Sequence, residues 1–178
     1  MIMQTSAGKL ALMAILTAIA LIIYIIEAQI PIPVPVPGVK LGLANAVILF
    51  ALFYTGKSYQ SPLVLTTANT FAILICRIVL GALFIGRPIA LIYSLAGGLL
   101  GLTAQVIIKR FVSDKQIWVC GAIGAVFHNI GQIAAAIVIT GTPAIAIYLP
   151  VLIIAGVFTG VLTGLIAQFT IERLRTDN

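Results

Sequence analysis

The polar side chains of this chain are few, and the densest group lies in the stretch GAVFHNIGQ, residues 124–132. This stretch contains the only histidine, His128, together with Asn129 and Gln132. On a helix, His128 and Gln132 share a face because they are four positions apart. One helix rarely needs three such groups for packing alone, so we expect hydrogen bonds to a ligand. The alternative is interhelical hydrogen bonding, worth about 0.6 kcal/mol on average in membrane bundles.

Glu27 and Arg77 also fall inside apolar runs, where a charge is costly and usually faces a cavity or a partner. The two could form an internal ion pair, or either could contact a ligand. An unpaired Arg77, with Lys40 and Arg87 at the outer rim, favours a ligand that combines a carboxylate or phosphate with an apolar remainder. The predicted substrate-binding residues are Lys40, Asn45, Arg77, Tyr93, His128, Asn129 and Gln132, with Glu27 as an ion-pair or ligand residue.

The same inventory argues against catalysis by this chain. Its four acidic residues are isolated from one another, so they cannot form the clustered carboxylate site that holds Mg²⁺ in metal-dependent enzymes. Cys76 and Cys120 have no metal-binding spacing, and a nucleotide-binding glycine loop is missing. We therefore expect no catalytic residue, no metal and no cofactor.

The composition shows what must position these residues. The chain has 178 residues, 8% of them charged, and a mean hydropathy of +1.24, which is typical of an integral membrane protein. Since a spanning helix needs roughly 20 apolar residues, we predict an all-α bundle of six transmembrane helices in a single domain, residues 1–178. The predicted spans are residues 9–28, 41–56, 62–85, 88–108, 116–140 and 143–168.

The positive charges predict the orientation of the bundle. The net charge of +6 is scattered through short loops and does not form a stripe, which argues against nucleic acid as a partner. By the positive-inside rule, both termini are expected in the cytoplasm. The cytoplasmic group is Lys9, Lys57, Lys109, Arg110, Lys115, Arg173 and Arg175, against Lys40 and Arg87 on the outer side.

The outer loop at residues 30–40 contains four prolines that alternate with aliphatic residues. Proline fixes φ and removes backbone donors, so an extended, stiff segment is expected. It is either a rigid connector or, because the run after it is short, a segment that dips into the outer half of the protein and lines a cavity. Glycines four apart, at Gly97 and Gly101 and again at Gly156, Gly160 and Gly164, predict close helix packing inside the bundle.

Several stretches resemble a known family. An Ala-x-x-x-Ala first helix (Ala14 and Ala18), the proline loop and PGVKLGLANAV resemble the substrate-binding S components of energy-coupling-factor (ECF) transporters. More specifically, GVKLGLAN, RIVLGALFIG, SLAGGLLG and GAVFHNIGQ are similar to the Gx transporter family, also called heptaprenyl diphosphate synthase component I. This resemblance covers nearly the whole chain.

The resemblance implies a function and partners. An S component of the prokaryotic plasma membrane captures a small molecule at the outer face and docks to a transmembrane coupling subunit driven by two ATPase subunits. Ala14 and Ala18 would form the docking face, and residues 31–40 would form a lid. Two alternatives stay open: a non-catalytic membrane component of a heptaprenyl diphosphate synthase system, and a stand-alone channel, which the missing polar line through the inner half disfavours.

Overall fold

The structure is a computed structural model that describes residues 6–30, 40–58, 62–86 and 88–176. The proline loop at residues 31–39 and Arg87 lie outside the described residues. All elements in the described ranges are helical. They are the α-helices α1 (Ser6–Glu27), α2 (Asn45–Ser58), α3 (Leu63–Ile85), α4 (Pro88–Ile108), α5 (Ile117–Thr140) and α6 (Leu149–Thr176), and the 3₁₀ helices η2 (Asp114–Gln116) and η3 (Pro143–Tyr148).

Five of the described helical segments are long and apolar enough to cross a membrane, so the chain is a multi-pass membrane protein. The exception is α2, whose apolar part, Asn45–Thr55, is shorter. Its 14 residues extend only about 21 Å, against roughly 30 Å for a hydrocarbon core.

One predicted helix boundary needs correction. The second helix begins at Asn45 and not at residue 41, because residues 42–45 form a turn closed by a 2.9 Å hydrogen bond from the Asn45 amide to the Gly42 carbonyl. The sixth predicted span begins at residue 143, as the candidate span Pro143–Leu174 does; its first residues, Pro143–Tyr148, form a 3₁₀ helix, and α6 begins at Leu149.

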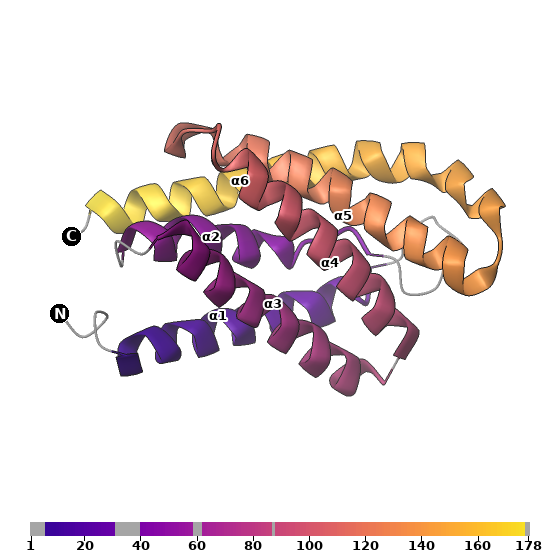
Figure 1. The fold of residues 1–178 in the computed structure, drawn as a ribbon, viewed down its shortest axis with the longest axis horizontal. Helices are drawn as coiled ribbons and strands as arrows, with labels where there is room; N and C mark the ends of the chain where they lie inside the picture. The colour runs from indigo at the N-terminus through magenta and orange to yellow at the C-terminus, as the bar shows by residue number, and fades with distance from the viewer. Residues whose placement is uncertain (1–5, 31–39, 59–61, 87, 177–178) are drawn as a thin grey trace.

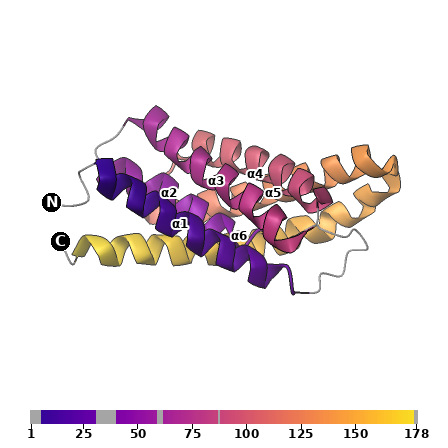
Figure 2. The ribbon, with the colours of Figure 1, turned by 90° about the horizontal axis from the view of Figure 1, so that it is seen from below.

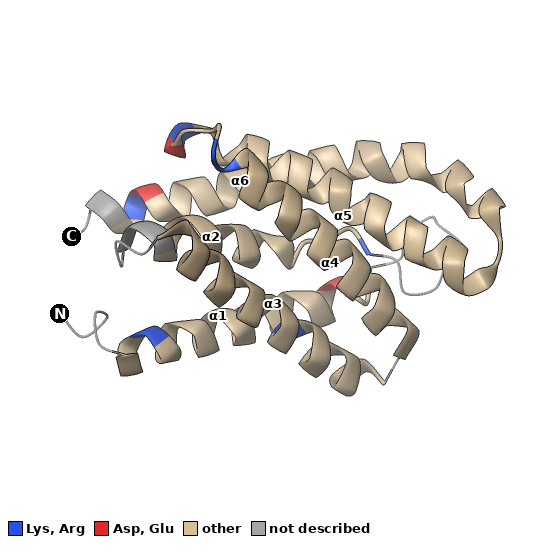
Figure 3. Ribbon diagram, in the orientation of Figure 1, with Lys and Arg blue, Asp and Glu red and all other residues tan. Residues whose placement is uncertain are grey.

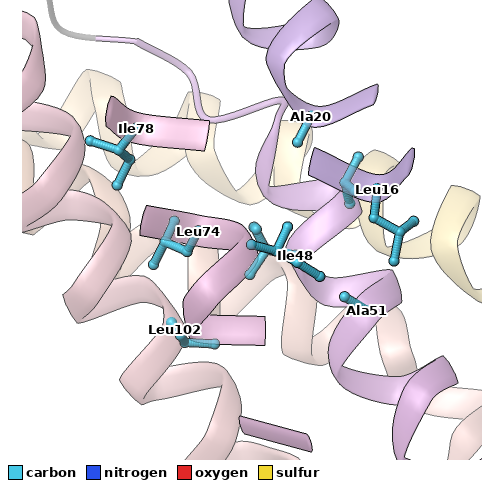
Figure 4. Close-up of a cluster of buried hydrophobic side chains, with 9 residues drawn as sticks. Leu16, Ala20, Ile48, Ala51, Leu74, Ile78 and Leu102 are labelled. Atoms are coloured by element: carbon cyan, nitrogen blue, oxygen red, sulfur yellow. The ribbon is translucent and has the colours of Figure 1, made fainter. Parts of the chain in front are cut away.

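The helices lie along one another in a bundle with both termini at the same end, and α1 and α3 cross on one side of it (Figures 1 and 2). The most extensive contacts are those of α5 with α4 and α6. A separate apolar core joins the first four helices (Figure 4). Its labelled side chains come from α1 (Leu16, Ala20), α2 (Ile48, Ala51), α3 (Leu74, Ile78) and α4 (Leu102).

Glycines bring the backbones of α4, α5 and α6 into close approach. A Cβ atom at Gly131 would lie 2.7 Å from the Ala96 carbonyl oxygen of α4, and one at Gly160 would lie 2.6 Å from the Gly121 carbonyl oxygen of α5. These approaches confirm the packing role predicted from the glycine spacing. We call this surface the glycine seam; it consists of Gly97, Gly101, Gly121, Gly124, Gly131, Gly156, Gly160 and Gly164.

Charged residues gather at the end of the bundle that holds both termini, and the opposite end of α5 and α6 has none (Figure 3). A few charged positions lie instead within the bundle. The described charged residues that are buried are Glu27, Lys40 and Arg77. The position of Lys40 differs from the prediction, because its side chain is buried and does not lie at an outer rim.

Candidate binding site

Four of the predicted binding residues come together inside the bundle. Lys40, Arg77, His128 and Gln132 lie with Tyr24 and Glu27 of α1 in a network of hydrogen bonds and ring contacts. All six are at least 93% buried. We call this group the buried polar cluster.

Gln132 of α5 holds the backbone of Lys40 at two points. The Lys40 amide donates to Gln132 Oε1 at 2.8 Å, and Gln132 Nε2 donates to the Lys40 carbonyl at 3.1 Å. This pairing satisfies both backbone groups of a buried residue that belongs to no helix. The chain that follows the proline loop is therefore fastened to α5.

His128 supports this arrangement from one turn below. Its Nε2 contacts Nε2 of Gln132, which is oriented as a donor by the bond to the Lys40 carbonyl. Nε2 of the imidazole must then accept, which places the proton on Nδ1 in the neutral ring. The Nδ1 atom faces α4, where a Cβ atom at Gly97 would lie 2.9 Å away, and it has no hydrogen-bond partner among the described residues. In this geometry His128 orients Gln132.

Glu27 faces the beginning of α2. Its carboxylate accepts a hydrogen bond from the Gly42 amide, and the Leu43 amide also faces it. Gly42 adopts a φ of 85°, a conformation that glycine adopts readily, and closes the turn into α2. A carboxylate at a helix N-terminus satisfies free amides and is stabilised by the helix dipole.

Two alternatives were open for Glu27 and Arg77: an internal ion pair, or contact of either residue with a ligand. No ion pair joins the two side chains within the described part of the chain, although each lies within electrostatic reach of the other. The closest partner of Glu27 is the α2 turn. A ligand contact by Glu27 stays a prediction.

Two cations lie against the Tyr24 ring. The Lys40 ammonium nitrogen is 3.1 Å from the ring centroid and donates to the Tyr24 carbonyl at 3.4 Å, and the Arg77 guanidinium carbon is 5.3 Å from the centroid. Both distances allow cation–π attraction. The ring has room beside α3 because residue 81 is glycine: a Cβ atom there would lie 2.7 Å from Tyr24 Cδ1.

Tyr24 was not among the predicted site residues. A tyrosine in an apolar helix is ordinarily a core residue, and its hydroxyl is within 3.3 Å of Ser94 Oγ. A signal was present in the spacing: Tyr24 lies one turn before Glu27, and Gly81 one turn after Arg77.

The Arg77 side chain has donors without a partner. It is 2% exposed, and neither Nε nor Nη2 has a hydrogen-bond partner among the described residues. These two nitrogens form one edge of the guanidinium plane, the edge that binds a carboxylate or phosphate with two parallel hydrogen bonds. Among the described residues, the cluster thus contains two cations, one carboxylate and an unsatisfied two-donor edge.

The other predicted binding residues make different contacts. Asn129 donates to the Leu152 carbonyl of α6 at 2.6 Å, and Tyr93 packs in an apolar group with Ile133, Ala136 and Leu152. Asn45 is buried at the beginning of α2, beside Gly42. Their ligand roles stay predictions. Within the described ranges, no three His, Cys, Asp or Glu side chains are grouped so that they could hold a metal ion.

Comparison with known proteins gives one match. The sequence model of the family described as heptaprenyl diphosphate synthase component I matches residues 16–170. Neither the curated proteins nor the solved structures contain a match to this chain. The matched region includes every residue of the buried polar cluster.

Proposed function

Because the chain belongs to the heptaprenyl diphosphate synthase component I family, whose match covers most of its length, we propose a binding function without catalysis in this polypeptide. The chain is the substrate-binding subunit of an ECF-type importer in the prokaryotic plasma membrane. It crosses the membrane six times, as a single domain with both termini in the cytoplasm. Its substrate is a small, anionic and partly apolar molecule, held in an outward-facing pocket.

The observation that supports this proposal most is that the cluster buries two cations with one carboxylate and leaves two Arg77 donors unpaired among the described residues. Removing one partner of a buried ion pair typically costs about 3–5 kcal/mol, because it leaves an uncompensated charge. A chain that keeps two cations and one carboxylate buried, with two guanidinium donors unsatisfied, is suited to receive an anion. The apolar side chains of the surrounding helices suit the remainder of such a substrate.

Purification from native membranes, followed by native mass spectrometry, tests the function. We expect the wild-type chain to retain a small anion of defined mass and Arg77→Ala to lose it while still folding. Ala68→Leu, at an exposed position of α3, is the control that keeps the anion. Wild-type protein without any retained molecule would contradict the proposal.

The proposed partners are a transmembrane coupling subunit and two ATPase subunits. Ala14 and Ala18 are exposed on α1 and flanked by exposed Ile15 and Ile19, so this face is open to a neighbour in the membrane. Ala14→Leu should preserve substrate binding and block assembly with the coupling subunit, whereas Ala68→Leu should preserve both. Normal transport by Ala14→Leu would refute this docking face.

The family's description favours a second candidate function. The chain could be the membrane component of a heptaprenyl diphosphate synthase system, with catalysis on a soluble, aspartate-rich partner. This function predicts that affinity capture recovers such a synthase and that prenyl transfer increases in the complex. Stable recovery of a synthase, with neither a small ligand nor coupling subunits, would favour it over import.

A further inference from the structure

The unpaired edge of Arg77 narrows the chemical class of the substrate. Nε and Nη2 present two N–H groups in one plane, at a spacing that matches the two oxygens of a carboxylate. Both nitrogens are buried and unpartnered among the described residues. A ligand that occupies this edge therefore meets two donors that no described residue occupies.

Most of the other donors of the cluster are already engaged; His128 Nδ1 also has no hydrogen-bond partner among the described residues, but it faces Gly97 of α4. The Lys40 ammonium donates to the Tyr24 carbonyl and lies on the Tyr24 ring. The Tyr24 hydroxyl pairs with Ser94, and the amides of Gln132 and Gly42 are used by Lys40 and Glu27. A phosphate monoester presents three acceptor oxygens, and this site offers two free donors on one edge.

The net charge of the cluster also favours a carboxylate over a phosphate ester as the bound group. Lys40 and Arg77 face a single carboxylate, that of Glu27, and the 31–39 loop adds no charged side chain. The carboxylate of Glu27 accepts from the Gly42 amide at the α2 N-terminus. Counted by formal charge, the cluster has one positive charge in excess. A monocarboxylate neutralises that charge, and a phosphate monoester, with about −1.5 to −2 charges at pH 7, exceeds it.

We propose that the substrate of this site is an apolar monocarboxylate, bound by two parallel hydrogen bonds to Nε and Nη2 of Arg77, and not a phosphate or diphosphate ester. The assignment rests on the proposed binding function and goes beyond it, since it excludes prenyl phosphates as the bound molecule. Lys40 and Tyr24 contribute the remaining positive potential and the aromatic surface beside the carboxylate.

Three matched probes test the assignment by calorimetric titration of the purified full-length protein: phenylacetate, benzyl phosphate and phenylacetamide. We expect phenylacetate to bind at least roughly tenfold more tightly than the other two, because each of them fails in charge or in donor matching. Equal or tighter binding of benzyl phosphate, or no binding of phenylacetate to folded protein, overturns the assignment.

Arg77→Lys separates the two-donor edge from its charge. A lysine preserves the positive charge but cannot make two parallel hydrogen bonds. Phenylacetate should bind roughly 10- to 100-fold more weakly to this variant, with a smaller change for benzyl phosphate. Arg110→Lys, at an exposed position after α4, is the matched control and should leave all three affinities unchanged. Equal losses for both anions would mean that Arg77 acts through charge alone, which contradicts the proposed geometry.

Failure of the monocarboxylate assignment can be distinguished from failure of the proposed binding function. A phosphate ester retained in native mass spectrometry would preserve the binding function and overturn the monocarboxylate assignment. Should Arg77→Lys not fold, the comparison of the three probes on wild-type protein still decides the assignment.

Discussion

The glycine seam and the buried polar cluster share α5 but use it in opposite ways. At the seam, backbones approach so closely that a Cβ atom at Gly131 would lie 2.7 Å from the Ala96 carbonyl oxygen. In the cluster, a buried guanidinium has two donors without a partner. Unpaired atoms near the seam, such as Gln105 Oε1 and Asn129 Oδ1, belong to neutral amides. The difference teaches that backbones approach closely where the helices need rigidity, and that the unmet hydrogen bonds of a charged side chain mark the region suited to a ligand.

The two regions meet where α4 and α5 touch. A Cβ atom at Gly97 would lie 2.7 Å from the His128 carbonyl oxygen and 2.9 Å from His128 Nδ1. The imidazole that orients Gln132 is therefore held against the seam. A rigid α4–α5 contact thus fixes the position of the Gln132 amide, and through it the backbone of Lys40.

Gly121→Leu should have the largest effect, because it fills the seam. A side chain at this position meets the backbone of α6 at Gly160 and Gly164, neither of which can move aside. We expect a loss of about 3 kcal/mol or more and a fall in melting temperature of roughly 6 °C or more. Thermal unfolding of the purified protein measures it. Ala68→Leu, at an exposed site, should unfold like wild type. An unchanged melting temperature for Gly121→Leu would show that the seam is loosely packed.

Gln132→Leu tests the cluster next. The substitution removes both hydrogen bonds to the Lys40 backbone and leaves two buried polar groups unpaired, at a cost of about 2 kcal/mol. Substrate binding should weaken as well, because Lys40 loses its fixed position. The measurements are thermal unfolding and calorimetric titration with phenylacetate.

The matched control for this substitution is Gln168→Leu in α6. Gln168 is also buried, but its side chain bonds only to Glu172 and its Oε1 has no partner in the described structure. We expect a stability change below about 1 kcal/mol and unchanged binding. Similar losses in both variants would mean that the two-point contact with Lys40 has no special role.

Glu27→Gln should have a smaller and more local effect. Glutamine can still accept from the Gly42 amide but loses the charge that interacts with the α2 N-terminus, worth about 0.3–1 kcal/mol. Amide hydrogen exchange should therefore accelerate in the first turn of α2. Glu172→Gln, on an exposed part of α6, is the control and should leave α2 unaffected. Exchange that accelerates in α3 but not in α2 would indicate that Glu27 acts mainly on Arg77.

The helices and five of the six residues of the buried polar cluster could be predicted from the sequence, because apolar runs and the polar residues within them are local features. Apolar runs predict helices, and the spacing of His128 and Gln132 correctly placed both on one face. The beginning of α2 was misplaced because the turn at Gly42 depends on Glu27, fifteen positions away. The pattern of apolar and polar residues within α2 does not indicate that contact.

Tyr24 was missed as a site residue, and Lys40 was predicted as one but placed at an outer rim. A lysine beside a proline loop is ordinarily exposed, yet here it is buried because an aromatic ring and the Gln132 amide meet it from different helices. Tyr24 gains its role only through Lys40 and Arg77, which lie on other elements. Such residues are identified by their contacts, and those arise in the folded bundle.

Asn129→Ala should give the smallest change and tests the boundary between the two regions. Asn129 is next to His128 in sequence, and the sequence predicts that it contacts substrate, but its amide donates to the Leu152 carbonyl of α6. Its Oδ1 already has no partner within the described structure, so removing the side chain costs one interhelical hydrogen bond, about 0.6 kcal/mol. We expect a small fall in thermal stability and unchanged phenylacetate affinity, in contrast to Gln132→Leu. A loss of affinity without a loss of stability would instead assign Asn129 to the binding site and extend the cluster across α5 toward α6.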